Sequence, residues 1–133
     1  MEEHKELLVK IVKALKERAK LEKVFIEFQY RYRGETFYID ILAQKSNHLF
    51  LFECKKKGKR DKAEKQLHFH KQALENTKRD QYWEGKLFPY TKISLFYISE
   101  MENKIVNLEA KKELLLDPLF LDDPIPFLED EDL

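Results

Sequence analysis

Two carboxylates and a lysine interrupt apolar runs that have the pattern of central strands. Asp40 lies within residues 37–43, and Glu53 and Lys55 lie at the end of residues 49–55. Acidic residues are disfavoured inside strands and are rarely buried without a partner. Their presence in two neighbouring strands therefore indicates a polar site within the sheet.

A hairpin turn at 46–47 would bring the two acids face to face. In that register the numbers of paired residues sum to 93, so Asp40 lies directly across from Glu53. Their Cβ atoms would then be about 5 Å apart. The two-residue repeat of a strand also places Lys55 on the same face as Glu53.

Facing carboxylates of this kind predict a divalent cation. Like charges opposite one another repel, and burial raises the cost unless a cation lies between them. Oxygen ligands without imidazole or thiolate suit Mg²⁺ or Mn²⁺, which keep waters that a phosphate oxygen or a nucleophile can replace. Lys55 would orient or deprotonate the attacking water, which is the chemistry of phosphodiester hydrolysis. The alternative is a salt-bridge cluster in a structural sheet.

The elements that must position this site follow from the hydrophobic pattern. Apolar residues at helical spacing predict a helix in the first twenty residues, and Asp61 is expected to cap a second helix. Strand patterns cover residues 24–32, 36–43, 49–55 and 93–98. Residues 101–116 are expected to add a short strand and a helix. The predicted fold is α/β (α+β): helix, three-stranded meander, helix and strand, with a mixed central sheet flanked by helices.

The first hairpin gives two further expectations. A turn at 34–35 makes paired numbers sum to 69, which places Gln29 beside Asp40 on the polar face. Strict alternation in the first strand places one set of apolar side chains on a single face. These side chains are Val24, Ile26, Phe28, Tyr30 and Tyr32.

Composition predicts one soluble, globular domain. The chain has 133 residues, 43% of them hydrophobic and 38% charged, and it contains no apolar run of membrane-spanning length. A single cysteine, Cys54, excludes an internal disulfide framework and a cysteine-cluster zinc site. The segment Met1–Lys5 does not resemble the start of an export signal, so we expect a cytoplasmic protein.

Charge divides the chain into a domain at 1–116 and an acidic, proline-containing tail at 117–133. Seven of the 25 acidic residues but none of the 25 basic ones lie in the tail, which leaves a formal charge of +7 on the domain. This pattern is typical of proteins that bind a polyanion, although a solvated surface would look the same. We expect the tail to cover the basic cleft, reach a partner subunit or recruit a protein partner.

Basic residues follow the candidate site directly and are expected to bind a nucleic-acid backbone through its phosphates. A solvated loop and helix face is the alternative. The set comprises Lys56, Lys57, Lys59, Arg60 and Lys62, together with Arg31 from the first hairpin.

The segments 39–43 and 52–55 resemble the core of the PD-(D/E)xK nuclease superfamily, and most closely that of archaeal Holliday-junction resolvases and related restriction-type nucleases. Ile39 stands where the name-giving proline would be. The resemblance implies a restriction-endonuclease-like core over residues 1–100. It also implies that Asp40 and Glu53 bind Mg²⁺ or Mn²⁺.

Further site residues are implied by the same resemblance. The main-chain carbonyl of Cys54 would be a metal ligand, and Lys55 would be the catalytic lysine. Gln66 matches a glutamine in the helix after the lysine, and Glu3 is the candidate for an acid of the first helix that binds the metal. The implied function is a Mg²⁺-dependent DNA endonuclease, including one for structured or branched DNA, that works as a homodimer. The alternative is a catalytically inactive, nuclease-like module that binds nucleic acid or a protein.

Overall fold

The computed structural model describes residues 2–18, 21, 23–57, 60–81 and 86–116. The described residues form an α+β fold with two helices and one six-stranded sheet. Neither helix in this part of the chain is long and apolar enough to cross a membrane. In chain order the elements are α1 (Glu2–Arg18), β1 (Lys23–Tyr32), β2 (Glu35–Lys45), β3 (His48–Lys55), α2 (Arg60–Gln81), β4 (Lys92–Ser99), β5 (Lys104–Asn107) and β6 (Lys112–Leu115).

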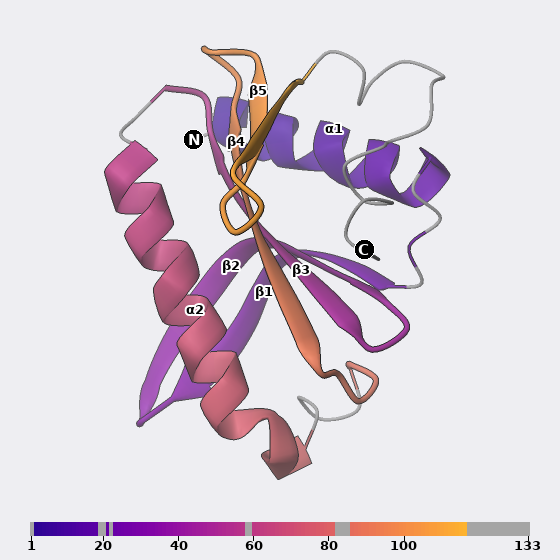
Figure 1. Ribbon diagram of the computed structural model, residues 1–133, viewed down its shortest axis with the longest axis vertical. Coiled ribbons are helices and arrows are strands. Elements are labelled where there is room, and N and C mark those ends of the chain that lie inside the picture. Colours follow the sequence, from indigo (N-terminus) through magenta and orange to yellow (C-terminus); the bar gives the residue numbers. More distant parts are fainter. Residues whose placement is uncertain (1, 19–20, 22, 58–59, 82–85, 117–133) are drawn as a thin grey trace.

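The strands follow one another across the sheet in chain order, and only the β3–β4 pair is parallel. Parallel neighbours need a long crossover, which α2 provides. The two helices cover opposite faces, with α1 on one side and α2 on the other (Figure 1). The predicted mixed sheet flanked by helices is therefore confirmed. Arg60 already belongs to α2, so Asp61 lies in its first turn and does not precede the helix as a cap.

Residues 101–116 differ from expectation, because they form the two strands β5 and β6 and no helix. The Asn107 side-chain oxygen accepts hydrogen bonds from the backbone N–H groups of Glu109 and Ala110, at 3.2 and 3.1 Å. This local turn favours a hairpin over continuation as a helix.

The first hairpin turns one residue earlier than predicted. Arg33 and Gly34 both have positive φ, 52° and 80°, which is the turn geometry that matches the twist of the two strands. Paired numbers therefore sum to 67, and Gln29 lies opposite Tyr38, not beside Asp40. The predicted register of that hairpin is wrong.

The second hairpin has the predicted register. Its turn lies at 46–47, and the β2–β3 pairs run from Lys45↔His48 to Ile41↔Phe52, all with numbers that sum to 93. The ladder ends there, one position before Asp40 and Glu53. The two acids therefore stand at the point where β2 leaves β3.

The β1–β2 ribbon bends sharply at this point (Figure 1). Val24 and Ile26 pack with the core under α1, whereas Phe28 and Tyr30 belong to the core under α2. Glu27, between them, has a φ of 50°. The predicted single face for the strand is therefore wrong, because the left-handed residue reverses the alternation.

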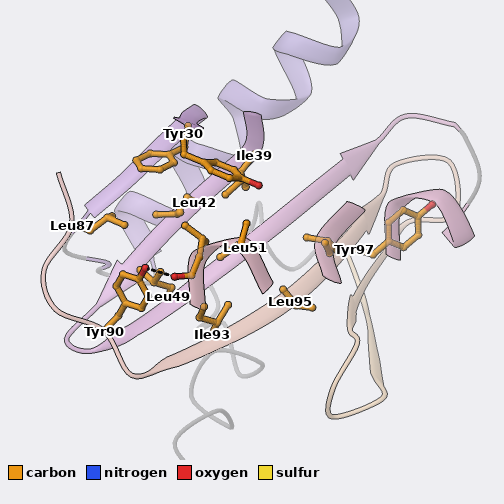
Figure 2. Packing of buried hydrophobic residues seen from close by; sticks show 14 of the residues in the cluster. Tyr30, Ile39, Leu42, Leu49, Leu51, Leu87, Tyr90, Ile93, Leu95 and Tyr97 are labelled. Carbon is orange, nitrogen blue, oxygen red and sulfur yellow. Dashed lines mark hydrogen bonds between the residues drawn. The ribbon is translucent and has the colours of Figure 1, made fainter. Parts of the chain in front are cut away.

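Two apolar cores hold the sheet between the helices. Figure 2 shows the core on the α2 side, where Leu49 and Leu51 of β3 pack beside Ile93 and Leu95 of β4. The alternate residues of β3 belong to the core under α1, so this strand is buried on both faces. Glu53 is thus a carboxylate in a strand in which every residue before Lys55 is buried.

Candidate active site

Asp40 is held at the fork between β2 and β3 by the backbone of the neighbouring strand. Its Oδ2 accepts a hydrogen bond of 2.9 Å from the N–H of Cys54. Its Oδ1 lies 3.7 Å from Nε2 of His4, near the start of α1. The side chain is only partly exposed, so the carboxylate has a fixed position at the end of the ladder.

Glu53 lies between Asp40 and Lys55 and is 4% exposed. Its Oε2 is 3.4 Å from Nζ of Lys55, and Tyr97 of β4 is its parallel partner. Burial, followed by the charge of Asp40, raises the pKa of Glu53 to about 7 from the ordinary 4.5, although Lys55 opposes the shift. The sequence prediction that these three side chains come together is confirmed; their catalytic role stays a prediction.

Cys54 separates the two site residues of β3. Its side chain is fully buried in the core under α1, and this burial raises the pKa of the thiol. The thiol is thus a buried core group and no nucleophile. The N–H and C=O of one strand residue point toward the same neighbour, so the Cys54 carbonyl shares an edge with Asp40.

Gln66 lies on the part of α2 that packs over the sheet, next to the buried Leu67. Its Oε1 is buried, and no other described group donates a hydrogen bond to it. A buried amide oxygen without a donor is costly, which favours a role in accepting a hydrogen bond from a bound water or substrate.

Among the α1 side chains that the structure describes, a histidine contacts the site. The side chain of Glu3, predicted as a metal ligand, lies outside the described side chains, and His4 is the residue that approaches Asp40. Sequence reasoning also missed Glu27, which falls opposite Asp40 between the pairs on either side of it. A turn predicted at 33–34 would have placed Glu27 opposite Asp40. The Glu27 side chain forms an ion pair of 3.3 Å with Lys5 of α1.

Two of the expected phosphate-binding residues already have acidic partners. Lys56 lies 3.3 Å from Glu100. Arg60 contacts Glu64 and Glu113, each at 3.2 Å, and these contacts hold its pKa above the ordinary value despite the opposing effect of desolvation. Both residues therefore tie the start of α2 and the end of β3 to neighbouring elements.

The other members of the basic set are placed differently. Lys57 and Lys62 are exposed beyond the end of β3 and on the first turn of α2. Lys59 lies outside the described residues. Arg31 is exposed near the tip of the β1–β2 hairpin and donates a hydrogen bond of 3.1 Å to the Gly34 carbonyl. It is separate from the basic run that follows β3.

The oxygen ligands at the fork fit a hard divalent ion that keeps most of its waters. Among the described residues no group of three or more His, Cys, Asp or Glu side chains is arranged to hold a metal. Mg²⁺ is commonly held by one or two carboxylates together with waters and substrate phosphates. Asp40, Glu53 and the Cys54 carbonyl meet that smaller requirement, and the partnerless Oε1 of Gln66 can accept a hydrogen bond from a water.

No protein-family model matches the chain, and no curated protein matches its sequence. The tail at 117–133 lies outside the described residues. Function is therefore inferred from the chemistry of the fork between β2 and β3.

Proposed function

We propose that this protein is a Mg²⁺- or Mn²⁺-dependent endonuclease that hydrolyses phosphodiester bonds in DNA, on a core of the PD-(D/E)xK type. The observation that carries the proposal is the meeting of Asp40, Glu53 and Lys55 where β2 leaves β3. A structural salt bridge does not require two carboxylates around one lysine in a buried strand.

A bound divalent ion would stabilise the charge that develops on the phosphate and lower the pKa of a coordinated water. Asp40, fixed by the Cys54 N–H, and Glu53 would hold that ion. Lys55, on the same strand as Glu53, would orient the attacking water by donating a hydrogen bond from its ammonium group, while the proton of the metal-bound water would pass to solvent. Gln66 would accept a hydrogen bond from the same water through its partnerless Oε1.

The exposed Lys57 and Lys62 would bind the phosphates on either side of the cleaved bond. Both lysines follow β3 closely in the chain, so a DNA backbone bound to them would run beside the fork between β2 and β3. The part of the chain that the structure describes carries one such site, and cleavage of both strands would need a homodimer. We place this activity in the cytoplasm, with the acidic tail as the segment that contacts a protein partner.

A second function, a nuclease-like module that binds DNA or a protein without cleaving it, is favoured by His4. Among the α1 side chains that the structure describes, the one that approaches Asp40 is an imidazole and not an additional carboxylate. Fewer acidic ligands mean weaker metal binding. Metal dependence separates the two functions, because a module of this kind binds DNA equally well with EDTA.

The test is cleavage of labelled duplex, single-stranded, flap and four-way-junction DNA, and of RNA, with Mg²⁺ or Mn²⁺. Lys55→Ala should lower the rate by about 100-fold or more, while DNA binding persists. Lys45→Ala removes an exposed lysine at the end of another strand and serves as the matched control, with unchanged activity. Absence of cleavage with every metal, alongside intact DNA binding, would replace the nuclease with the module.

A further inference from the structure

Three aromatic rings form a surface patch where the distal part of the β1–β2 hairpin meets α2; we call Tyr32, Phe37 and Phe69 the aromatic platform. The ring centroids of Phe37 and Phe69 are 4.8 Å apart, and those of Tyr32 and Phe69 are 6.1 Å apart. Phe69 is 39% exposed, while the other two are half-buried and pack against the core. The rings thus have a fixed base and an exposed surface.

One cationic and one polar side chain contact the Tyr32 ring of the platform. The guanidinium of Arg33 lies 5.0 Å from the centre of the Tyr32 ring, and Arg31 is exposed on the same hairpin. Glu35 is the acidic residue of this tip, so the two arginines leave it positively charged. Asn76 donates a hydrogen bond of 3.0 Å to the Tyr32 hydroxyl and fixes that ring to α2. Aromatic faces beside arginines complement bases attached to phosphates.

The platform shares β2 and α2 with the proposed active site, and the β1–β2 hairpin runs beside α2 (Figure 1). Phe37 precedes Asp40 by three residues in β2, a distance of about 10 Å along a strand. Phe69 follows Gln66 by three residues in α2, about 4.5 Å along the helix axis. A DNA strand that leaves the fork along the hairpin would reach these rings.

We infer that the aromatic platform stacks unpaired bases of a single DNA strand, about two or three nucleotides from the cleaved phosphate at roughly 3.4 Å per base. This inference rests on the proposed function, for which it names the substrate: DNA with a single-stranded segment next to the cleavage site. Bases inside a duplex have both faces covered by their neighbours and offer none to Phe69. Unpaired bases expose their faces, and each one that stacks on an aromatic side chain adds affinity.

The first test measures binding by fluorescence anisotropy in EDTA, with labelled oligothymidylate and a duplex of equal length. Phe69→Leu keeps an apolar side chain but removes the ring, and it should weaken oligothymidylate binding by about tenfold while duplex binding stays within about twofold. Phe88→Leu is the matched control, because Phe88 is 44% exposed and has Lys23 4.2 Å from its ring centre, outside the platform. Equal effects of the two variants, or equal loss for both DNA forms, would overturn the platform. That result would favour a protein partner or duplex contact.

A second pair of variants tests the charge without touching the core. Arg33→Asn and Lys111→Asn each remove one exposed cation at a position of positive φ, 52° and 56°, which asparagine tolerates. Only the first should weaken oligothymidylate binding, by several-fold. Both binding tests are carried out in EDTA and do not depend on cleavage. The platform would therefore be supported by these results even if no cleavage were observed. Conversely, metal-dependent cleavage with Phe69→Leu and Arg33→Asn both neutral would retain the nuclease and refute the platform.

Discussion

Replacement of Glu53 by glutamine should make the metal-free protein more stable at alkaline pH. Glu53 is almost fully buried beside Asp40, and Lys55 only partly offsets the burial. Burial favours the neutral form, so the folded protein retains the Glu53 proton up to a pKa of about 7, whereas the unfolded chain releases it near 4.5. Glutamine has nearly the same shape and remains neutral throughout.

The magnitude follows from proton linkage. Between pH 4.5 and 7 the folded state binds more protons at Glu53 than the unfolded state, so the free energy of unfolding falls as the pH rises. The difference between the two pKa values corresponds to roughly 3 kcal/mol, fully lost above about pH 8. The Glu53→Gln variant does not lose this stability, because glutamine does not ionise. It should therefore match the wild type near pH 4.5 and exceed its stability by up to about 3 kcal/mol at pH 8.

Urea unfolding followed by circular dichroism at several pH values, in EDTA, measures this difference. Glu6→Gln, which removes an exposed carboxylate on α1, is the control and should change stability little at any pH. Added Mg²⁺ should raise the stability of the wild type at pH 8, by about 2.7 kcal/mol at 100 times its dissociation constant, and leave Glu53→Gln unchanged. A variant that is no more stable than the wild type at pH 8 would refute the argument that burial destabilises the Glu53 carboxylate.

Four other outcomes are expected. Burial lowers the pKa of His70, which contacts the Tyr30 hydroxyl, to about 4, so acidification from pH 6.5 toward 4 should lower the stability of the wild type relative to that of His70→Gln by roughly 3 kcal/mol in urea titrations, since both proteins share the opposite contribution of Glu53. Glu27→Gly should stabilise the fold by about 1 kcal/mol in the same assay, because glycine adopts a φ of 50° without strain. Lys62→Gln should weaken DNA binding of every sequence and reduce the logarithmic salt dependence by about one, measured by anisotropy. Deletion of residues 117–133 should strengthen DNA binding if the acidic tail covers the basic surface, and unchanged binding by a folded truncation would count against that role.

The site geometry that the sequence predicted correctly depends on short-range rules. The turn at 46–47 fixes the β2–β3 register, and that register brings Asp40 to Glu53. The two-residue repeat then places Lys55 next to Glu53. Each step concerns residues close in the chain, whose pairing is set by one turn and by the burial of both faces of β3. The contact between His4 and Asp40 spans a helix and two strands, and no local pattern encodes it.

The bend in β1–β2 is the feature that sequence patterns could not supply, and it is also what opens the site. Apolar alternation continues through Val24 to Tyr32 without a break, so the pattern gives no sign that Glu27 has positive φ. The change of face at Glu27 becomes favourable only because the two halves of the ribbon pack in two separate cores, one under α1 and the other under α2. Once the ribbon turns toward α2, β2 can no longer pair with the end of β3, and the Cys54 N–H bonds to the Asp40 side chain in place of a backbone carbonyl. The same bend carries Phe37 to Phe69, so the packing that creates the fork also forms the surface beside it.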